Sequence, residues 1–109
     1  MIAECTTAAF KAEVIEADRP VLVDFHAAWC GPCQAQAPII ENIARSAGRD
    51  AKVVKVDIDR SPELAALFGV RSIPTLLLFN RGKIIHRFSG VTSGSTIAAA
   101  LVGQMDRPG

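Results

Sequence analysis

Short apolar segments alternate with longer amphipathic segments along the whole chain. Residues 21–25 (VLVDF) are short, β-branched and apolar, a pattern typical of a strand buried on both faces. Residues 52–58 (KVVKVDI) predict another strand. Residues 75–79 and 83–88 predict two more, and the intervening Asn80-Arg81-Gly82 contains a glycine, which favours an antiparallel hairpin.

Four segments have apolar residues at the spacing of a helix face. These residues are Phe10, Val14 and Ala17 in the first segment; Ile39, Ile40, Ile43, Ala44 and Ala47 in the second; Leu64, Leu67 and Phe68 in the third; and Ile97, Leu101 and Met105 in the fourth. Thr6 or Thr7 is placed to cap the first helix, and Gly48 to end the second. Ser61 and Gly69 bracket the third helix as its N-cap and its C-terminal glycine.

The order of these elements predicts the fold. They follow one another as α-β-α-β-α-β-β-α; strands linked by helices pair in parallel, whereas the hairpin adds an antiparallel edge. We therefore expect an α/β fold with a central mixed β-sheet of four or five strands, flanked on both faces by about four helices. The length of 109 residues suits one domain and no linker or repeat divides the chain, so we expect a single domain over residues 1–109.

Composition and charge narrow the classes of function. Half of the residues are apolar and 21% are charged, which is typical of a globular chain and excludes a disordered one. The formal net charge is +1, so the sequence predicts neither a nucleic-acid partner nor attraction to an anionic membrane. The first ten residues lack the features of a secretory signal, and the longest apolar segment, residues 73–79, is far shorter than the ~20 residues of a spanning helix. The three cysteines are an odd number, and two of them stand three residues apart, unlike the cysteines of a secreted disulfide scaffold. We therefore expect a cytoplasmic protein whose cysteines are kept for their chemistry.

Cys30 and Cys33 stand between the first predicted strand and the second helix. Residues three apart on a helix share a face and lie roughly 5 Å apart, within the Cα separation that a disulfide needs. At a helix start, unpaired N–H groups and the positive end of the helix dipole favour a thiolate, so we expect Cys30 to be the attacking sulfur. Cys33, one turn farther in, is expected to be more buried and to act second. Pro32 in the first turn sacrifices no hydrogen bond and stiffens the pair.

Two other interpretations of this cysteine pair are available. A zinc site needs two further ligands, and Cys5, His26 and His86 lie at unsuitable spacings. A purely structural disulfide between residues three apart closes a loop too small to add much stability. Redox exchange between a dithiol and a disulfide is therefore the favoured interpretation.

Three further residues are considered for supporting roles. Asp24 interrupts the apolar strand; if it is buried, its pKa is expected to be raised, and the alternative is a side chain that points outward at the strand end. Lys55 lies in the second predicted strand, where the pattern alone indicates a solvated lysine. Trp29 belongs either to the core or, as we favour for an aromatic residue in a turn, to a contact surface.

The motif Trp29-Cys30-Gly31-Pro32-Cys33 after VLVDF, with Ile73-Pro74-Thr75 downstream and Gly90 near the last helix, resembles the thioredoxin family. The resemblance runs from about residue 7 to about residue 104. It implies a thioredoxin fold in which Pro74 is a cis-proline that lies against the cysteine pair.

The resemblance also implies roles for individual residues. Asp24 would relay a proton to or from Cys33, and Lys55 would lie near Asp24. The substrate-binding groove would be formed by Trp29, Gly31, Pro32, Ile73, Pro74, Gly90 and Val91.

The activity implied by the resemblance is that of a general protein-disulfide reductase. Cys30 would attack a client disulfide and Cys33 would resolve the mixed disulfide, without a bound cofactor or metal. A thioredoxin reductase would regenerate the dithiol, with NADPH and FAD in that partner only, and the chain would act as a monomer on disulfide-containing client proteins. Two alternatives stay open: a disulfide oxidase or isomerase, which usually has histidine where Pro32 stands, and a docking module without redox turnover.

His26 and Gln34 depart from the family pattern. Thioredoxins usually have a second tryptophan at the position of His26; the histidine is either an ordinary surface residue or a group that titrates near neutral pH and couples to Asp24 or the thiols. Gln34 replaces a lysine or arginine, which is expected to reduce thiolate stabilisation slightly and to shift partner preference. Cys5 is expected to be a small buried hydrophobe; if exposed, it would be open to glutathionylation or to an intermolecular disulfide.

Overall fold

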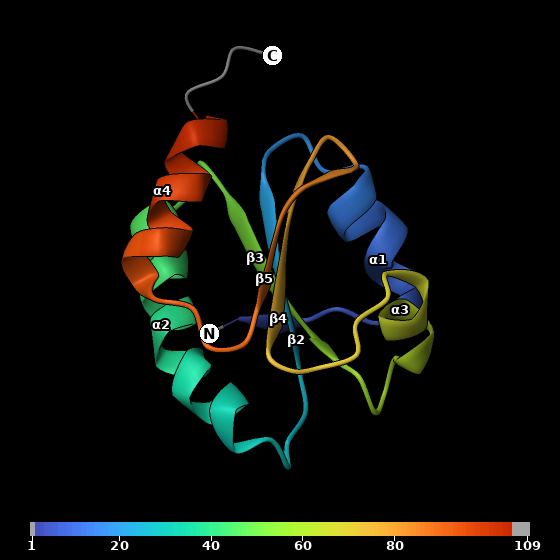
Figure 1. Ribbon diagram of the computed structural model, residues 1–109. Coiled ribbons are helices and arrows are strands. Elements are labelled where there is room, and N and C mark those ends of the chain that lie inside the picture. The colour runs from blue at the N-terminus through green and yellow to red at the C-terminus, as the bar shows by residue number, and fades with distance from the viewer. Residues whose placement is uncertain (1, 106–109) are drawn as a thin grey trace.

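A five-stranded sheet runs through the middle of the molecule, with helices on both faces (Figure 1). The computed structural model describes residues 2–105. The strands are β1 (Ala3–Glu4), β2 (Val21–His26), β3 (Lys52–Asp57), β4 (Thr75–Asn80) and β5 (Lys83–Ser89). They are ordered β1-β3-β2-β4-β5; β1 and β2 each pair in parallel with β3, and β4 pairs antiparallel with both β2 and β5. The predicted mixed sheet is therefore confirmed.

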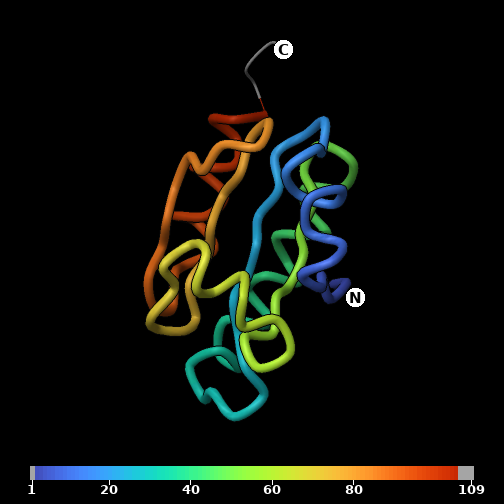
Figure 2. Tube along the Cα trace, turned by 90° about the vertical axis from the view of Figure 1, so that its right-hand side faces the viewer, coloured from blue at the N-terminus to red at the C-terminus, as the bar shows by residue number. Residues whose placement is uncertain are grey.

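Two helical layers cover this sheet. On one face lie α2 (Gly31–Ala47) and α4 (Gly94–Met105); on the other lie α1 (Thr7–Phe10), the π-helix η1 (Lys11–Ile15) and α3 (Pro62–Leu67). Each layer encloses its own core. Figure 2 shows the β4–β5 hairpin along one side of the molecule and the N-terminal segment on the opposite side, as the strand order requires.

The central strand β2 positions the candidate site. Its first five residues are all buried, because β2 has a strand on either side and a helical layer on each face. Side chains alternate between the faces: Leu22 packs with residues of α2 and α4, whereas Val23 and Phe25 pack in the opposite core. Asp24 therefore lies on the face that α2 covers, in the same row as Leu22.

The N-terminal segment differs from the expectation in two ways. Strand β1 was not expected, since two residues are too short to show a hydrophobic period; it forms by pairing Ala3 and Glu4 with β3. The first helix ends at Ile15 as a π-helix and does not reach Ala17, which packs against the core from beyond the helix. Thr6 caps α1 as expected, with its hydroxyl accepting the N–H of Ala9 at 3.3 Å.

The third helix and the hairpin also correct the expectation. Leu67 was expected to face inward, yet it is 71% exposed, because Leu64 in α3 and Phe68 at its C-cap are the residues that pack against the core. The hairpin turn consists of Arg81 and Gly82 alone, since Asn80 already pairs with Lys83. Both turn residues have positive φ, 52° and 80°, as a two-residue hairpin turn requires.

A matched pair of glycine substitutions tests this packing. Gly82→Ala is expected to lower the free energy of unfolding by more than about 1 kcal/mol, because φ is +80° and the added Cβ would lie 3.1 Å from the carbonyl oxygen of Ile15. Gly103→Ala, inside α4 with open space around the new Cβ, is expected to raise it by about 0.5–1 kcal/mol. Urea denaturation of both variants measures the difference; equal effects of the same sign would contradict the account of the turn.

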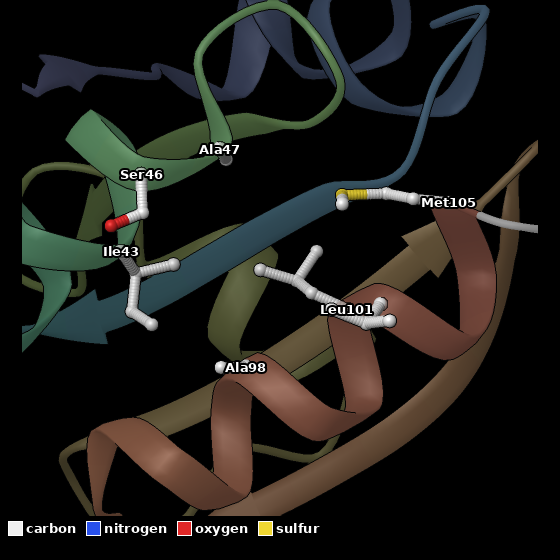
Figure 3. Close-up of a pocket in the computed structure, with 7 residues that line it drawn as sticks. Ile43, Ser46, Ala47, Ala98, Leu101 and Met105 are labelled. Carbon is white, nitrogen blue, oxygen red and sulfur yellow. The ribbon is translucent and has the colours of Figure 1, made fainter.

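An apolar groove of about 100 Å³ lies between α2 and α4, with Ile43 and Leu101 pointing into it (Figure 3). It belongs to the last turns of α2, about 15 Å along the helix from Cys33, so it is separate from the cysteine pair. Within residues 2–105, none of the helices is long and apolar enough to cross a membrane.

Candidate active site

The cysteine pair opens helix α2 directly after the central strand. Cys30 is the N-cap of α2, and its sulfur accepts the backbone N–H of Cys33 at 3.2 Å. Gly31 and Pro32 form the first turn, where a proline costs no hydrogen bond. Cys30 and Cys33 are joined by a disulfide, and their Cα atoms are 5.3 Å apart, as the spacing predicted. The sulfur of Cys30 thus lies at the positive end of a 17-residue helix, where a thiolate is stabilised.

A loop between α3 and β4 covers this pair. The peptide bond between Ile73 and Pro74 is cis, as the resemblance implied. The Cys30 sulfur lies 3.7 Å from the carbonyl oxygen of Ile73, and both cysteines pack with Ala27 against Ile73. Because of this cover, the expectation that Cys33 is the more buried cysteine is wrong: Cys30 is 4% exposed and Cys33 5%.

Asp24 is buried on the α2-facing side of β2. It is 2% exposed, and its Oδ1 has no hydrogen-bond partner within the described residues. The pKa of Asp24 is raised from 3.8 to about 6, chiefly because burial disfavours the charged carboxylate. The charges of His26 and Lys55 oppose this rise, and the charge of Glu4 adds to it. The expectation of a buried carboxyl with a raised pKa is confirmed, and the outward-pointing alternative is wrong.

Lys55 lies beside Asp24 on the neighbouring strand. The two residues are directly paired between β2 and β3, and Lys55 is half-buried. Residues paired across adjacent strands project on the same face, so the ammonium group shares the α2-facing side with the carboxyl. The expected position of Lys55 near Asp24 is confirmed, and Lys55 is not a fully solvated lysine.

Comparison with known proteins decides the family. The thioredoxin family model matches residues 1–102. The chain belongs to the thioredoxin family. It is 46% identical to Thioredoxin 1 of Synechococcus elongatus over 99 residues, which cover 91% of this chain and 92% of that protein. It is 44% identical to Thioredoxin of Pyropia yezoensis over 92% of this chain and 94% of the relative, and 44% identical to Thioredoxin of Mycobacterium tuberculosis (strain ATCC 25618 / H37Rv) over 88% of this chain and 83% of the relative.

Membership of the thioredoxin family settles the class of chemistry. Thioredoxins are thiol-disulfide oxidoreductases that carry a redox-active disulfide and no cofactor. Here the Cys-Gly-Pro-Cys motif has the geometry for dithiol–disulfide exchange, with Cys30 and Cys33 at bonding distance. Within residues 2–105, no group of three His, Cys, Asp or Glu side chains is arranged to hold a metal ion.

The expected thioredoxin groove residues adjoin either the cysteine motif or the Pro74 loop. Trp29 is 68% exposed, and its Nε1–H donates to Asp59 at 2.8 Å, so it lies on the surface and not in the core. Val91 is 52% exposed, and the N–H of Gly90 donates to the carbonyl of Pro74 at 2.8 Å. Gly31 and Pro32 are exposed in the first turn of α2. An apolar rim therefore lies beside the disulfide, but its role in binding clients stays a prediction.

Gln36 is a buried site residue that the sequence analysis missed. It is fully buried in α2, its amide Nε2–H donates to the Thr92 carbonyl at 3.0 Å, and its Oε1 accepts the Thr92 N–H at 2.7 Å. These two bonds fasten the segment that carries Gly90 and Val91 to the cysteine helix. The signal in the sequence was a glutamine on the buried side of α2, among Cys33, Ile40 and Ile43.

The three remaining sequence candidates have distinct surroundings. Cys5 is 4% exposed and packs in the core beneath α1, as expected, and burial raises the pKa of its thiol. Gln34 is exposed on α2, one residue after Cys33, and its effect on partner preference stays a prediction. His26 has its Nε2 2.6 Å from Oε1 of Glu4, as a satisfied histidine would, and its charge lowers the pKa of Asp24; its coupling to the reaction stays a prediction.

Proposed function

We propose that this chain is a general protein-disulfide reductase. The observation that carries the proposal is the placement of Cys30 as the N-cap of α2 with Cys33 bonded to it. In the reduced protein, the Cys30 thiolate attacks one sulfur of a client disulfide, and the other client sulfur leaves. The Cys33 thiol then loses its proton and attacks Cys30, which releases the second client sulfur and closes the Cys30–Cys33 disulfide.

Asp24 is the proposed proton acceptor for Cys33. A buried carboxyl whose pKa is about 6 is largely ionised at neutral pH and takes up a proton far more readily than an ordinary aspartate. Lys55 lowers this pKa from the adjacent strand, so it keeps part of Asp24 in the base form. This division of roles is part of the proposal.

The proposed recycling partner is a thioredoxin reductase that carries FAD and draws electrons from NADPH. The support is the likeness to proteins named thioredoxin over nine-tenths of the chain. We also propose that the chain works as a monomer in the cytoplasm, on protein disulfides and not on nucleic acid or membranes. The near-neutral charge supports the choice of partners, and burial of the third cysteine, Cys5, removes a route to disulfide-linked dimers.

Reduction of insulin coupled to NADPH oxidation tests this function. With purified thioredoxin reductase, the chain is expected to support continuous NADPH consumption, which Cys30→Ser abolishes. Insulin reduction no faster than with the reductase alone would contradict the proposed function.

The proposed groove has its own test, a matched pair of valines. Val91 lies beside the Pro74 loop, whereas Val102 lies on α4; they are 52% and 49% exposed. Val91→Ser is expected to raise KM for insulin about fivefold, because an apolar contact worth about 1 kcal/mol is lost, with little effect on the reduction of a small disulfide. Val102→Ser is expected to leave both KM for insulin and the reduction of the small disulfide unchanged. Equal effects of the two substitutions would contradict the proposal that Val91 contacts clients.

A further inference from the structure

His26 and Glu4 form a polar contact at the active-site end of the sheet. His26 is the last residue of β2, and its Nε2 lies 2.6 Å from Oε1 of Glu4 in β1. The side chains are 16% and 40% exposed, so the imidazole is largely sheltered. Strands β1 and β2 are not neighbours, since β3 lies between them, and the contact therefore reaches over β3.

The strand register places this contact on the same face as Asp24. Lys55 of β3 pairs directly with Asp24 on one side and with Glu4 on the other, so these three side chains form one row across the sheet. His26 follows Asp24 by two residues in the same strand and therefore projects on the same face. These four ionisable groups, together with Asp57, which pairs with His26, thus share the α2-facing side of the sheet next to the cysteine helix.

We propose that His26, held in place by Glu4, is a positioning residue that favours the carboxylate form of Asp24 and so promotes the step in which Cys33 resolves the mixed disulfide. The inference rests on the proposed function, because it assigns His26 to the proton acceptor of that reaction. A protonated imidazole on the same face attracts the carboxylate of Asp24, whose Oδ1 has no hydrogen-bond partner within the described residues. In agreement, the charge of His26 lowers the pKa of Asp24, against burial and Glu4, which raise it.

Few other charged groups lie around His26 and Asp24 among the described residues. From β3, Lys55 faces Asp24, and Asp57 pairs with His26. Oδ1 of Asp57 accepts the backbone N–H groups of Asp59 and Arg60 in the turn after β3. On the β4 side, Asp24 pairs with Leu76, which is apolar. Helix α2 carries Glu41 and Arg45 more than two turns beyond Cys33, and α4 has no charged residue.

The step that His26 promotes balances in atoms and electrons. The Cys33 thiol transfers its proton to the Asp24 carboxylate, and the Cys33 sulfur attacks the Cys30 sulfur. The Cys30–Cys33 bond forms as the bond between Cys30 and the client breaks, and the departing client thiolate takes a proton from water. The rate depends on the fraction of Asp24 in the carboxylate form, and His26 acts through that fraction alone.

Titration of the Asp24 carboxyl by ¹³C NMR in the oxidised protein tests the inference, because Cys30 and Cys33 do not titrate in the disulfide. His26→Gln is expected to raise the midpoint by about half a pH unit, as removal of a nearby cation does. His26→Arg keeps a positive charge that can pair with Glu4 and is expected to restore the original midpoint. His86→Gln is the matched control: His86 lies in β5, stacked on Phe88, and its loss is expected to leave the midpoint unchanged.

A kinetic readout in the reduced protein separates charge from structure. Below the Asp24 midpoint, His26→Gln is expected to slow release of a preformed mixed disulfide about threefold, the factor that half a pH unit produces, and to leave the rate at pH 8.5 unchanged. In a Glu4→Gln background, the same substitution is expected to shift the midpoint less, because the imidazole is no longer held. An unmoved Asp24 midpoint in a folded His26→Gln protein that still reduces insulin would overturn this inference alone. Failure of the original chain to reduce insulin at any pH would overturn the proposed function, while the titration would still show whether His26 lowers the pKa of Asp24.

Discussion

Cys33→Ser is expected to halt the reaction at a covalent intermediate. Cys30 keeps its position as the N-cap of α2, so its thiolate still attacks a client disulfide. Serine cannot resolve the mixed disulfide, because its hydroxyl is a poor nucleophile toward sulfur at neutral pH. Turnover is expected to fall by at least roughly a thousandfold, in line with the loss of one member of a catalytic unit.

Intact mass spectrometry of the Cys33→Ser protein mixed with a disulfide client makes this visible. The expected product is one adduct per chain, linked through Cys30 and released by dithiothreitol. Cys5→Ala is the matched control, because Cys5 is buried in the opposite core and takes no part in the exchange. Adduct formation through Cys5, or turnover by Cys33→Ser near the original rate, would contradict the assignment.

Asp24→Asn is expected to stabilise the folded chain while it impairs the reaction. The pKa of Asp24 is raised from 3.8 to about 6 because folding removes the carboxyl from water. Between these values the unfolded chain loses its proton first, so the stability of the native protein falls as pH rises from about 4 to about 6. Above pH 6 the whole penalty is present, about 3 kcal/mol at 1.36 kcal/mol per pH unit. A neutral amide removes most of it.

Urea denaturation as a function of pH measures this effect. At pH 8 the Asp24→Asn protein is expected to be about 2–3 kcal/mol more stable than the original chain, with the difference vanishing below about pH 4. Asp50→Asn, at an exposed aspartate, is expected to differ in stability from the original chain by almost the same small amount at every pH. A gain in stability that is equally large at pH 4 and pH 8 would show that ionisation of Asp24 does not destabilise the folded protein. The same Asp24→Asn protein is expected to release mixed disulfides at least tenfold more slowly near neutral pH, since the proton acceptor is gone.

The fold was predictable because its strongest signals are local. Residues 21–25 are apolar at nearly every position, which is typical of a central strand buried on both faces. The short glycine-containing turn before Lys83 favours an antiparallel hairpin. The cysteine pair was predictable for the same reason, since three-residue spacing at a helix start fixes the separation of the two Cα atoms and places Cys30 at the positive end of the helix.

What escaped prediction depends on contacts between distant segments. Gln36 finds its partner Thr92 only when α2 packs beside the segment after β5, 56 residues away. Strand β1 has no period of its own and exists because β3 offers it an edge, which is also how Glu4 comes to meet His26. The equal burial of the two cysteines likewise reflects cover by the Pro74 loop, which no pattern around Cys30 reveals.

The central claim is that the Cys30–Cys33 pair works as a reductant. Its most direct test is a redox titration of the purified protein in dithiothreitol buffers, with free thiols trapped by alkylation and counted by intact mass. The account predicts that Cys30 and Cys33 are alkylated together in one two-electron transition, at a strongly reducing potential such as the value of about −270 mV known for thioredoxin. A transition near −120 mV, in the range of dedicated disulfide oxidants, would contradict it and make the chain an oxidant despite Pro32.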